Sequence, residues 1–141
     1  MNLFAYGTLM VPEVLRAVTG RDFRWHEAVL RGYLCLKARG ATDPGLFAFP
    51  DRQTEGVVYT DVDADSIERI DVFEGDFYER HEVTVETSDG QWIEAVTYTV
   101  KPGHEKLLSS EPWDEYDFRE AHLTEFLRHH QGFSRLDTAG P

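Results

Sequence analysis

The hydrophobic positions of the chain follow two periodicities, which predict strands and helices in turn. Runs rich in β-branched, aromatic and leucine residues predict strands at residues 2–6, 23–37, 46–49, 55–62, 79–87 and 91–100. Apolar residues three and four positions apart predict helices at residues 12–19, 65–74 and 115–130, with a single helical turn within residues 105–110. The pattern therefore predicts an α+β fold, a small curled mixed β-sheet or β-barrel flanked by a few helices.

Glycine, proline and short polar residues mark where these elements end. The sequence Ser88-Asp89-Gly90 is a typical hairpin turn between the last two strands. A break in the second strand is expected near residues 31–32. Residues 40–50, rich in Gly, Pro, Asp and Thr, predict a surface loop around the short strand at residues 46–49.

The last predicted helix is amphipathic and would close the domain. Its core face would carry Phe118, Leu123, Phe126 and Leu127. Gly132 would end this helix, and the residues after it have the composition of a frayed terminus. We therefore expect a single domain over residues 1–132 and a C-terminal tail over residues 133–141.

The helix predicted at residues 65–74 carries a carboxylate at an unusual position. Ile67, Ile70 and Glu74 stand at i, i+3 and i+7, so Glu74 shares the face that the two isoleucines would bury. Gly75 suits the position just after a helix, which places Glu74 at the helix C-terminus. Apolar neighbours and the negative end of the helix dipole both disfavour a charged carboxylate, which would raise its pKa. Such a group suits proton transfer near neutral pH, whereas the alternative is a solvated glutamate in a fraying turn.

The connection between the first strand and the first helix is a second candidate site. Backbone N–H groups before a helix are unpaired and can hold a carboxylate or phosphate. Gly7 would let a ligand approach the main chain closely. The alternative for residues 7–10 is an ordinary strand–turn–helix connection.

Composition narrows the classes of function. The 141 residues carry a formal charge of −12, which opposes binding to nucleic acid or to anionic membranes. No apolar run is long enough to cross a membrane, and the N-terminus lacks the features of a signal peptide, so we expect a cytoplasmic protein.

The single cysteine, Cys35, alternates with leucines in a predicted buried strand and is expected to be a core residue. No metal-ligand spacing, phosphate loop or nucleophile elbow is present, so neither metal nor cofactor is expected.

Four short motifs follow one another along two-thirds of the chain. They are FAYGTL at residues 4–9, EGVVY at residues 55–59, IDVFEGDFYER at residues 70–80 and EAVTY at residues 94–98. In this order and spacing they resemble the γ-glutamylcyclotransferase-like family, in particular its AIG2-like and γ-glutamylamine cyclotransferase branch. The family's YG(S/T)L and FEGxxYxR motifs, which the first and third stretches match, are a specific pair.

The resemblance implies a small β-barrel flanked by helices and an active site with defined parts. Glu74 would be the general acid/base. The substrate-binding residues would be Tyr6, Gly7, Thr8 and Leu9, which form the backbone cradle, with Tyr78 and Arg80 beside them. For Arg80 the alternative is a solvated strand residue.

The implied reaction is intramolecular. The α-amine of a γ-glutamyl group attacks its own γ-carbonyl, which gives 5-oxoproline and a free amine or amino acid, without metal or cofactor. The implied partner is a small γ-glutamyl molecule. Two other classes stay open: a non-catalytic small-molecule binding domain on the same scaffold, in which Glu74 only recognises an ammonium group, and an acidic interaction module.

Overall fold

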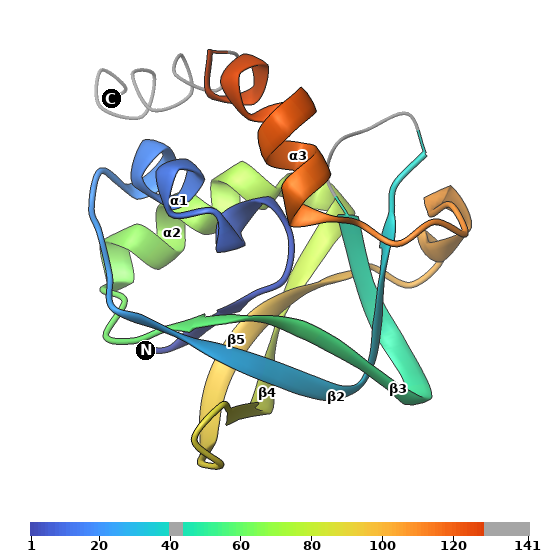
Figure 1. Ribbon diagram of the computed structural model, residues 1–141, viewed down its shortest axis with the longest axis horizontal. Helices are drawn as coiled ribbons and strands as arrows, with labels where there is room; N and C mark the ends of the chain where they lie inside the picture. Colours follow the sequence, from blue (N-terminus) through green and yellow to red (C-terminus); the bar gives the residue numbers. More distant parts are fainter. Residues whose placement is uncertain (40–43, 129–141) are drawn as a thin grey trace.

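Five strands form a closed barrel in the computed structural model, which describes residues 1–39 and 44–128 (Figure 1). The strands are β1 (Leu3–Ala5), β2 (Trp25–Lys37), β3 (Pro44–Tyr59), β4 (Tyr78–Thr87) and β5 (Trp92–Val100). They are ordered β1-β3-β2-β4-β5 around the barrel, and every neighbouring pair is antiparallel except β1 and β5. The parallel pairing of Leu3 with Val96 closes the barrel. The expected mixed barrel is confirmed.

Three α-helices whose two ends both lie within the described residues gather on one side of this barrel (Figure 1). They are α1 (Pro12–Thr19), α2 (Ala64–Glu74) and α3 (Glu115–Ala121), and three short 3-10 helices are η1 (Thr8–Met10), η2 (Gly75–Phe77) and η3 (Glu105–Leu107). Within the described residues, no helix has the length and apolar character needed to cross a membrane.

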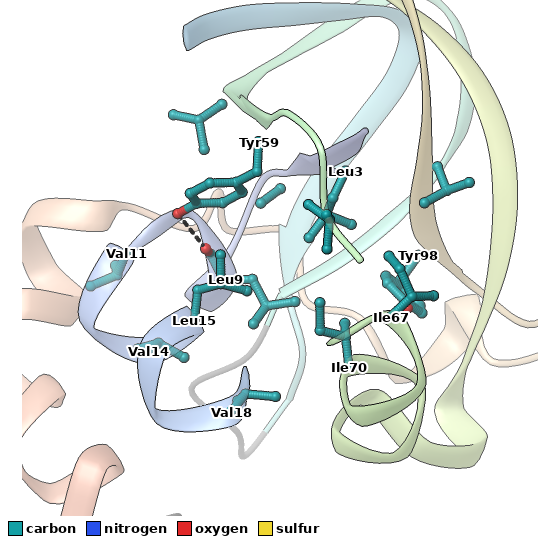
Figure 2. Packing of buried hydrophobic residues seen from close by; sticks show 14 of the residues in the cluster. Leu3, Leu9, Val11, Val14, Leu15, Val18, Tyr59, Ile67, Ile70 and Tyr98 are labelled. Carbon is teal, nitrogen blue, oxygen red and sulfur yellow. Dashed lines mark hydrogen bonds between the residues drawn. The ribbon is translucent and has the colours of Figure 1, made fainter. Parts of the chain in front are cut away.

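The core has two parts because strand side chains alternate between the two faces of the sheet. Phe4, Leu30, Val58 and Val85 belong to a cluster built from strand residues and from Tyr6, which fills the barrel. The opposite face of β1, β3 and β5 packs against the helices, and Figure 2 shows this second cluster. There the buried Tyr59 hydroxyl donates a hydrogen bond to the Leu9 carbonyl oxygen at 2.9 Å, which fixes η1 against β3.

Local signals position α2 as expected. The Asp63 carboxylate caps the helix by accepting hydrogen bonds from the Ser66 N–H at 3.1 Å and the Ser66 hydroxyl at 2.7 Å. Ile67 and Ile70 are buried against β1 and β5. Gly75 has a φ of 73°, a conformation that favours glycine, and it ends the helix directly after Glu74.

The predicted strand at residues 46–49 is confirmed, but the surface loop expected around it is wrong over its described part. Residues 44–50 belong to β3, whose pairing with β2 continues past a bulge near Gly32 until Pro44 lies opposite Lys37. Pro44 is tolerated because it is the first residue of the strand. Gly45 has no side chain to obstruct Val100 and Leu108, whose atoms lie 2.5 and 2.6 Å from where its Cβ would be. Residues 40–43 lie outside the described part of the chain.

The predicted continuous helix at residues 115–130 is interrupted. Helix α3 ends at Ala121, His122 adopts a non-helical conformation, and residues 123–128 are helical again. Positions eight residues apart lie about 12 Å apart along a continuous helix. The break instead brings the rings of Phe118 and Phe126 to 5.3 Å, and both are buried as predicted. Leu123 and Leu127 pack against them, partly buried. The expected end of the helix near Gly132 and the tail lie outside the described residues.

Candidate active site

A small cavity lies where the end of β1 meets the end of α2. It is lined by residues 4–9, Pro44, Glu74, Tyr78 and Tyr98. Six of the seven site residues expected from the sequence therefore share one cavity, although they come from two separate stretches of the chain. Its volume of about 20 Å³ is enough for about one water molecule.

The cradle segment offers unpaired donors to this cavity. The N–H of Met10 donates to the Gly7 carbonyl at 2.9 Å inside η1, so this amide is not available to a ligand. The N–H groups of Gly7, Thr8 and Leu9 donate to no acceptor among the described residues. Thr8 and Leu9 are buried, so these donors lie where water is scarce. Three adjacent unpaired amides can hold an anion.

Pro44 forms the wall opposite Gly7. A Cβ placed on Gly7 would lie 2.3 Å from Pro44 Cγ, so the two residues are in contact only because position 7 has no side chain. The Tyr78 hydroxyl donates to the Pro44 carbonyl at 2.5 Å, which ties the start of β4 to the start of β3.

A second, wider cavity of about 280 Å³ adjoins the first. Glu74, Tyr78 and Tyr98 line both cavities, and Arg80 lines only the wider one. Glu74 is the half-buried last residue of α2 and forms part of the wall that the two cavities share. Arg80 lies opposite Tyr98 in the β4–β5 ladder, and opposite residues project from the same face of the sheet.

Asp71, one turn before Glu74, connects these strands to α2. Its Oδ1 accepts a hydrogen bond from the Tyr98 hydroxyl at 2.6 Å, and its Oδ2 accepts one from Arg80 Nη1 at 2.8 Å. Burial raises the pKa of Tyr98, and the hydrogen bond to Asp71 and the charges of Asp71 and Glu74 raise it further. Tyr98 is therefore a neutral hydroxyl at physiological pH. Its proton is directed to Asp71, which leaves its oxygen lone pairs available to other donors.

Cys35 is not part of this site. It is half-buried, and burial raises the pKa of its thiol to about 12, so it stays protonated and is a poor nucleophile. Within residues 1–39 and 44–128, no three His, Cys, Asp or Glu side chains gather closely enough to hold a metal ion.

Comparison with known families assigns the chain. The model of the family described as gamma-glutamyl cyclotransferase, AIG2-like, matches residues 3–115. The protein belongs to this AIG2-like gamma-glutamyl cyclotransferase family. The match includes all four motifs and every residue that lines the two cavities.

Individual relatives are distant but cover most of the chain. The Arabidopsis thaliana protein named AIG2 C is 29% identical over 127 residues, which are 89% of this chain and 76% of that protein. A solution structure of an Arabidopsis thaliana protein superposes with a TM-score of 0.70 at 25% identity and covers 99% of this chain and 84% of its own. A solved structure named gamma-glutamyl cyclotransferase has a TM-score of 0.59 at 20% identity, with 92% and 85% covered, which shows a shared fold.

Three residues of the site were not expected from the sequence of this AIG2-like family member. Pro44 was assigned to a surface loop, and Asp71 was identified only as part of the motif at residues 70–80. Tyr98 was identified only as part of a strand motif, although its two-residue alternation with Val96 and Val100 would have placed it on the face toward the helices.

Proposed function

We propose that the protein is a γ-glutamyl cyclotransferase. It would convert a γ-glutamyl amine or γ-glutamyl amino acid to 5-oxoproline and release the free amine or amino acid. Family membership supports an activity of this type. The observation that carries the proposal is that Glu74 lines the same cavity as the unpaired amides of Gly7, Thr8 and Leu9.

Binding has to bring two ends of one substrate together. The unpaired N–H groups of the cradle would hold the α-carboxylate of the glutamyl group or the oxyanion that develops at its γ-carbonyl. The α-ammonium would then lie at Glu74, with the Tyr98 oxygen as a second acceptor. Because attacking and attacked atoms belong to one molecule, folding the chain into a near-attack geometry supplies much of the rate.

The chemistry then needs one proton carrier. Glu74 takes a proton from the α-ammonium group, which frees the nitrogen lone pair to form a bond to the γ-carbon. The second proton that this nitrogen gives up ends on the released amine, which leaves as an ammonium ion. The tetrahedral intermediate collapses by breaking the bond between that carbon and the departing nitrogen, and Glu74 returns a proton to this nitrogen. No water is consumed, and the atoms of the substrate are divided between 5-oxoproline and the released amine.

The cavities also imply a movement. Small-molecule sites usually enclose about 300–1,000 Å³, far more than the cavity beside the cradle. A γ-glutamyl group therefore has to occupy both cavities, and side chains in their common wall of Glu74, Tyr78 and Tyr98 would shift when it binds.

The test is a panel of γ-glutamyl compounds assayed for 5-oxoproline by chromatography. The wild type is compared with Glu74→Gln and with Glu68→Gln, which changes an exposed glutamate on the same helix away from both cavities. Product with the wild type and Glu68→Gln, but not with Glu74→Gln, supports the proposal. Stabilisation by 5-oxoproline without turnover of any compound would instead identify a non-catalytic binding domain.

A further inference from the structure

We propose that Arg80 binds a carboxylate on the leaving group, so that γ-glutamyl amino acids are preferred over γ-glutamyl amines without a carboxylate. This inference rests on the proposed cyclotransferase activity and specifies its substrate class.

The guanidinium of Arg80 is held in place and yet is largely unused. Its Nη1 donates to Asp71 Oδ2 at 2.8 Å, and the other oxygen of Asp71 is fixed by the Tyr98 hydroxyl. Arg80 makes no other hydrogen bond within the described part of the chain, so its Nε and Nη2 donors remain open. A planar guanidinium with an open edge matches a carboxylate through two parallel hydrogen bonds.

The order of groups across the two cavities indicates which carboxylate this would be. The cradle amides lie at the small cavity, Glu74 forms part of the wall that the two cavities share, and Arg80 lies only at the wide one. A glutamyl group held by the cradle presents its γ-carbonyl at Glu74. The substituent on the departing nitrogen then extends into the wide cavity, whose volume of about 280 Å³ has room for a small amino acid.

The charges of the wide cavity agree with this placement. Arg80 is the sole cation among its described lining residues, and the acids there are Asp71 and Glu74. The substrate α-ammonium would balance Glu74, and Asp71 occupies only one nitrogen of Arg80. About 38% of the Arg80 side chain is exposed, so a leaving-group carboxylate can reach it by displacing water.

Two substrates that differ only in this carboxylate test the proposal. Alanine and ethylamine share the same two-carbon frame, so γ-glutamyl-alanine and γ-glutamyl-ethylamide form a matched pair. The wild type should show the higher kcat/KM for γ-glutamyl-alanine. Arg80→Gln should lower kcat/KM for γ-glutamyl-alanine by about 10-fold or more, as expected when hydrogen bonds to a charged group are lost, and should change the value for γ-glutamyl-ethylamide by less than about twofold.

Arg31→Gln is the control variant. Arg31 forms a similar exposed ion pair with Glu86, at 2.9 Å, and lines neither cavity. This variant should retain the wild-type preference. Arg80→Lys keeps the positive charge but cannot form two parallel hydrogen bonds to a carboxylate. It should show a smaller loss of kcat/KM, confined to γ-glutamyl-alanine. It also provides a test if the Gln variant does not fold.

Different failures are distinguishable. Equal losses on both substrates would assign Arg80 to the glutamyl group or to the structure of the wall, and equal wild-type activity on both would show that no leaving-group carboxylate is recognised. Either result overturns the role of Arg80 while 5-oxoproline is still formed. Absence of 5-oxoproline from every substrate with folded wild-type protein overturns the proposed function itself, and this inference with it.

Discussion

Replacing Glu74 by Gln tests whether this residue serves catalysis or the stability of the fold. The carboxyl group lies at the last position of α2, half-buried, with Asp71 one turn earlier on the same helix. A negative charge at a helix C-terminus costs about 0.3–1 kcal/mol, and a like charge one turn away adds about 0.2–0.5 kcal/mol. Because Arg80 and Tyr98 already balance Asp71, the second contribution should be at the low end of its range.

Gln has nearly the shape of Glu without its charge, so the substitution should raise the free energy of unfolding by roughly 0.3–1 kcal/mol at pH 7. For a chain of this size this corresponds to an increase in Tm of roughly 1–4 °C. The same change removes the proposed proton carrier, and turnover should fall by about 10²–10⁴-fold. Melting temperature and 5-oxoproline release are measured on the same preparation.

Other outcomes have different meanings. Unchanged turnover would show that Glu74 is a solvated surface residue, and the proposed role would be wrong. A lower Tm together with lost activity would show that the carboxylate anchors the structure through hydrogen bonds. The exposed Glu68, on the same helix, should tolerate the same substitution without loss of turnover.

Three further predictions concern the surroundings of the site. Gly7→Val should abolish the thermal shift caused by 5-oxoproline and should cost about 1–3 kcal/mol of stability, because its Cβ would meet Pro44 Cγ at 2.3 Å. If this variant binds 5-oxoproline as the wild type does, the cradle is not the binding site. Tyr98→Phe should lower the free energy of unfolding by only about 1 kcal/mol in thermal melts, since water can replace the lost hydrogen bond at the partly exposed Asp71, and a much larger loss would mean that this bond is essential to the fold. Alkylation of Cys35 by iodoacetamide at pH 8 should be more than about 100-fold slower in the native than in the unfolded protein, because burial raises its pKa to about 12; equal rates would show that the thiol is accessible.

The sequence alone identified those parts of the site whose conformation is set by residues close by along the chain. The shared face of Ile67 and Ile70 and the end of α2 at Gly75 both depend on residues within or next to one helix. Those signals place Glu74 at a helix end whatever surrounds it. The hairpin at residues 88–90 has the same local origin, with Gly90 at a φ of 87°.

The strand-rich pattern and the helices also predicted the class of fold, because alternation and helical spacing are properties of short segments. The extent of β3 was beyond such reasoning. Its first residues contain proline and glycine and have weak strand propensity on their own, and they are ordered by pairing with the far end of β2. The break after α3 was also beyond such reasoning, because the ring contact between Phe118 and Phe126 that accompanies it joins positions eight residues apart.

Only the tertiary structure decided how the site is completed. Pro44 meets Gly7 across 37 positions, and Asp71 joins Arg80 of β4 to Tyr98 of β5. These contacts exist because the barrel closes and α2 packs on one face of it, and no local propensity specifies which distant side chains then come within hydrogen-bonding distance. Sequence alone therefore located Glu74 and residues 6–9, the proposed proton carrier and cradle, while closure of the barrel determined the walls between them and the open guanidinium edge of Arg80.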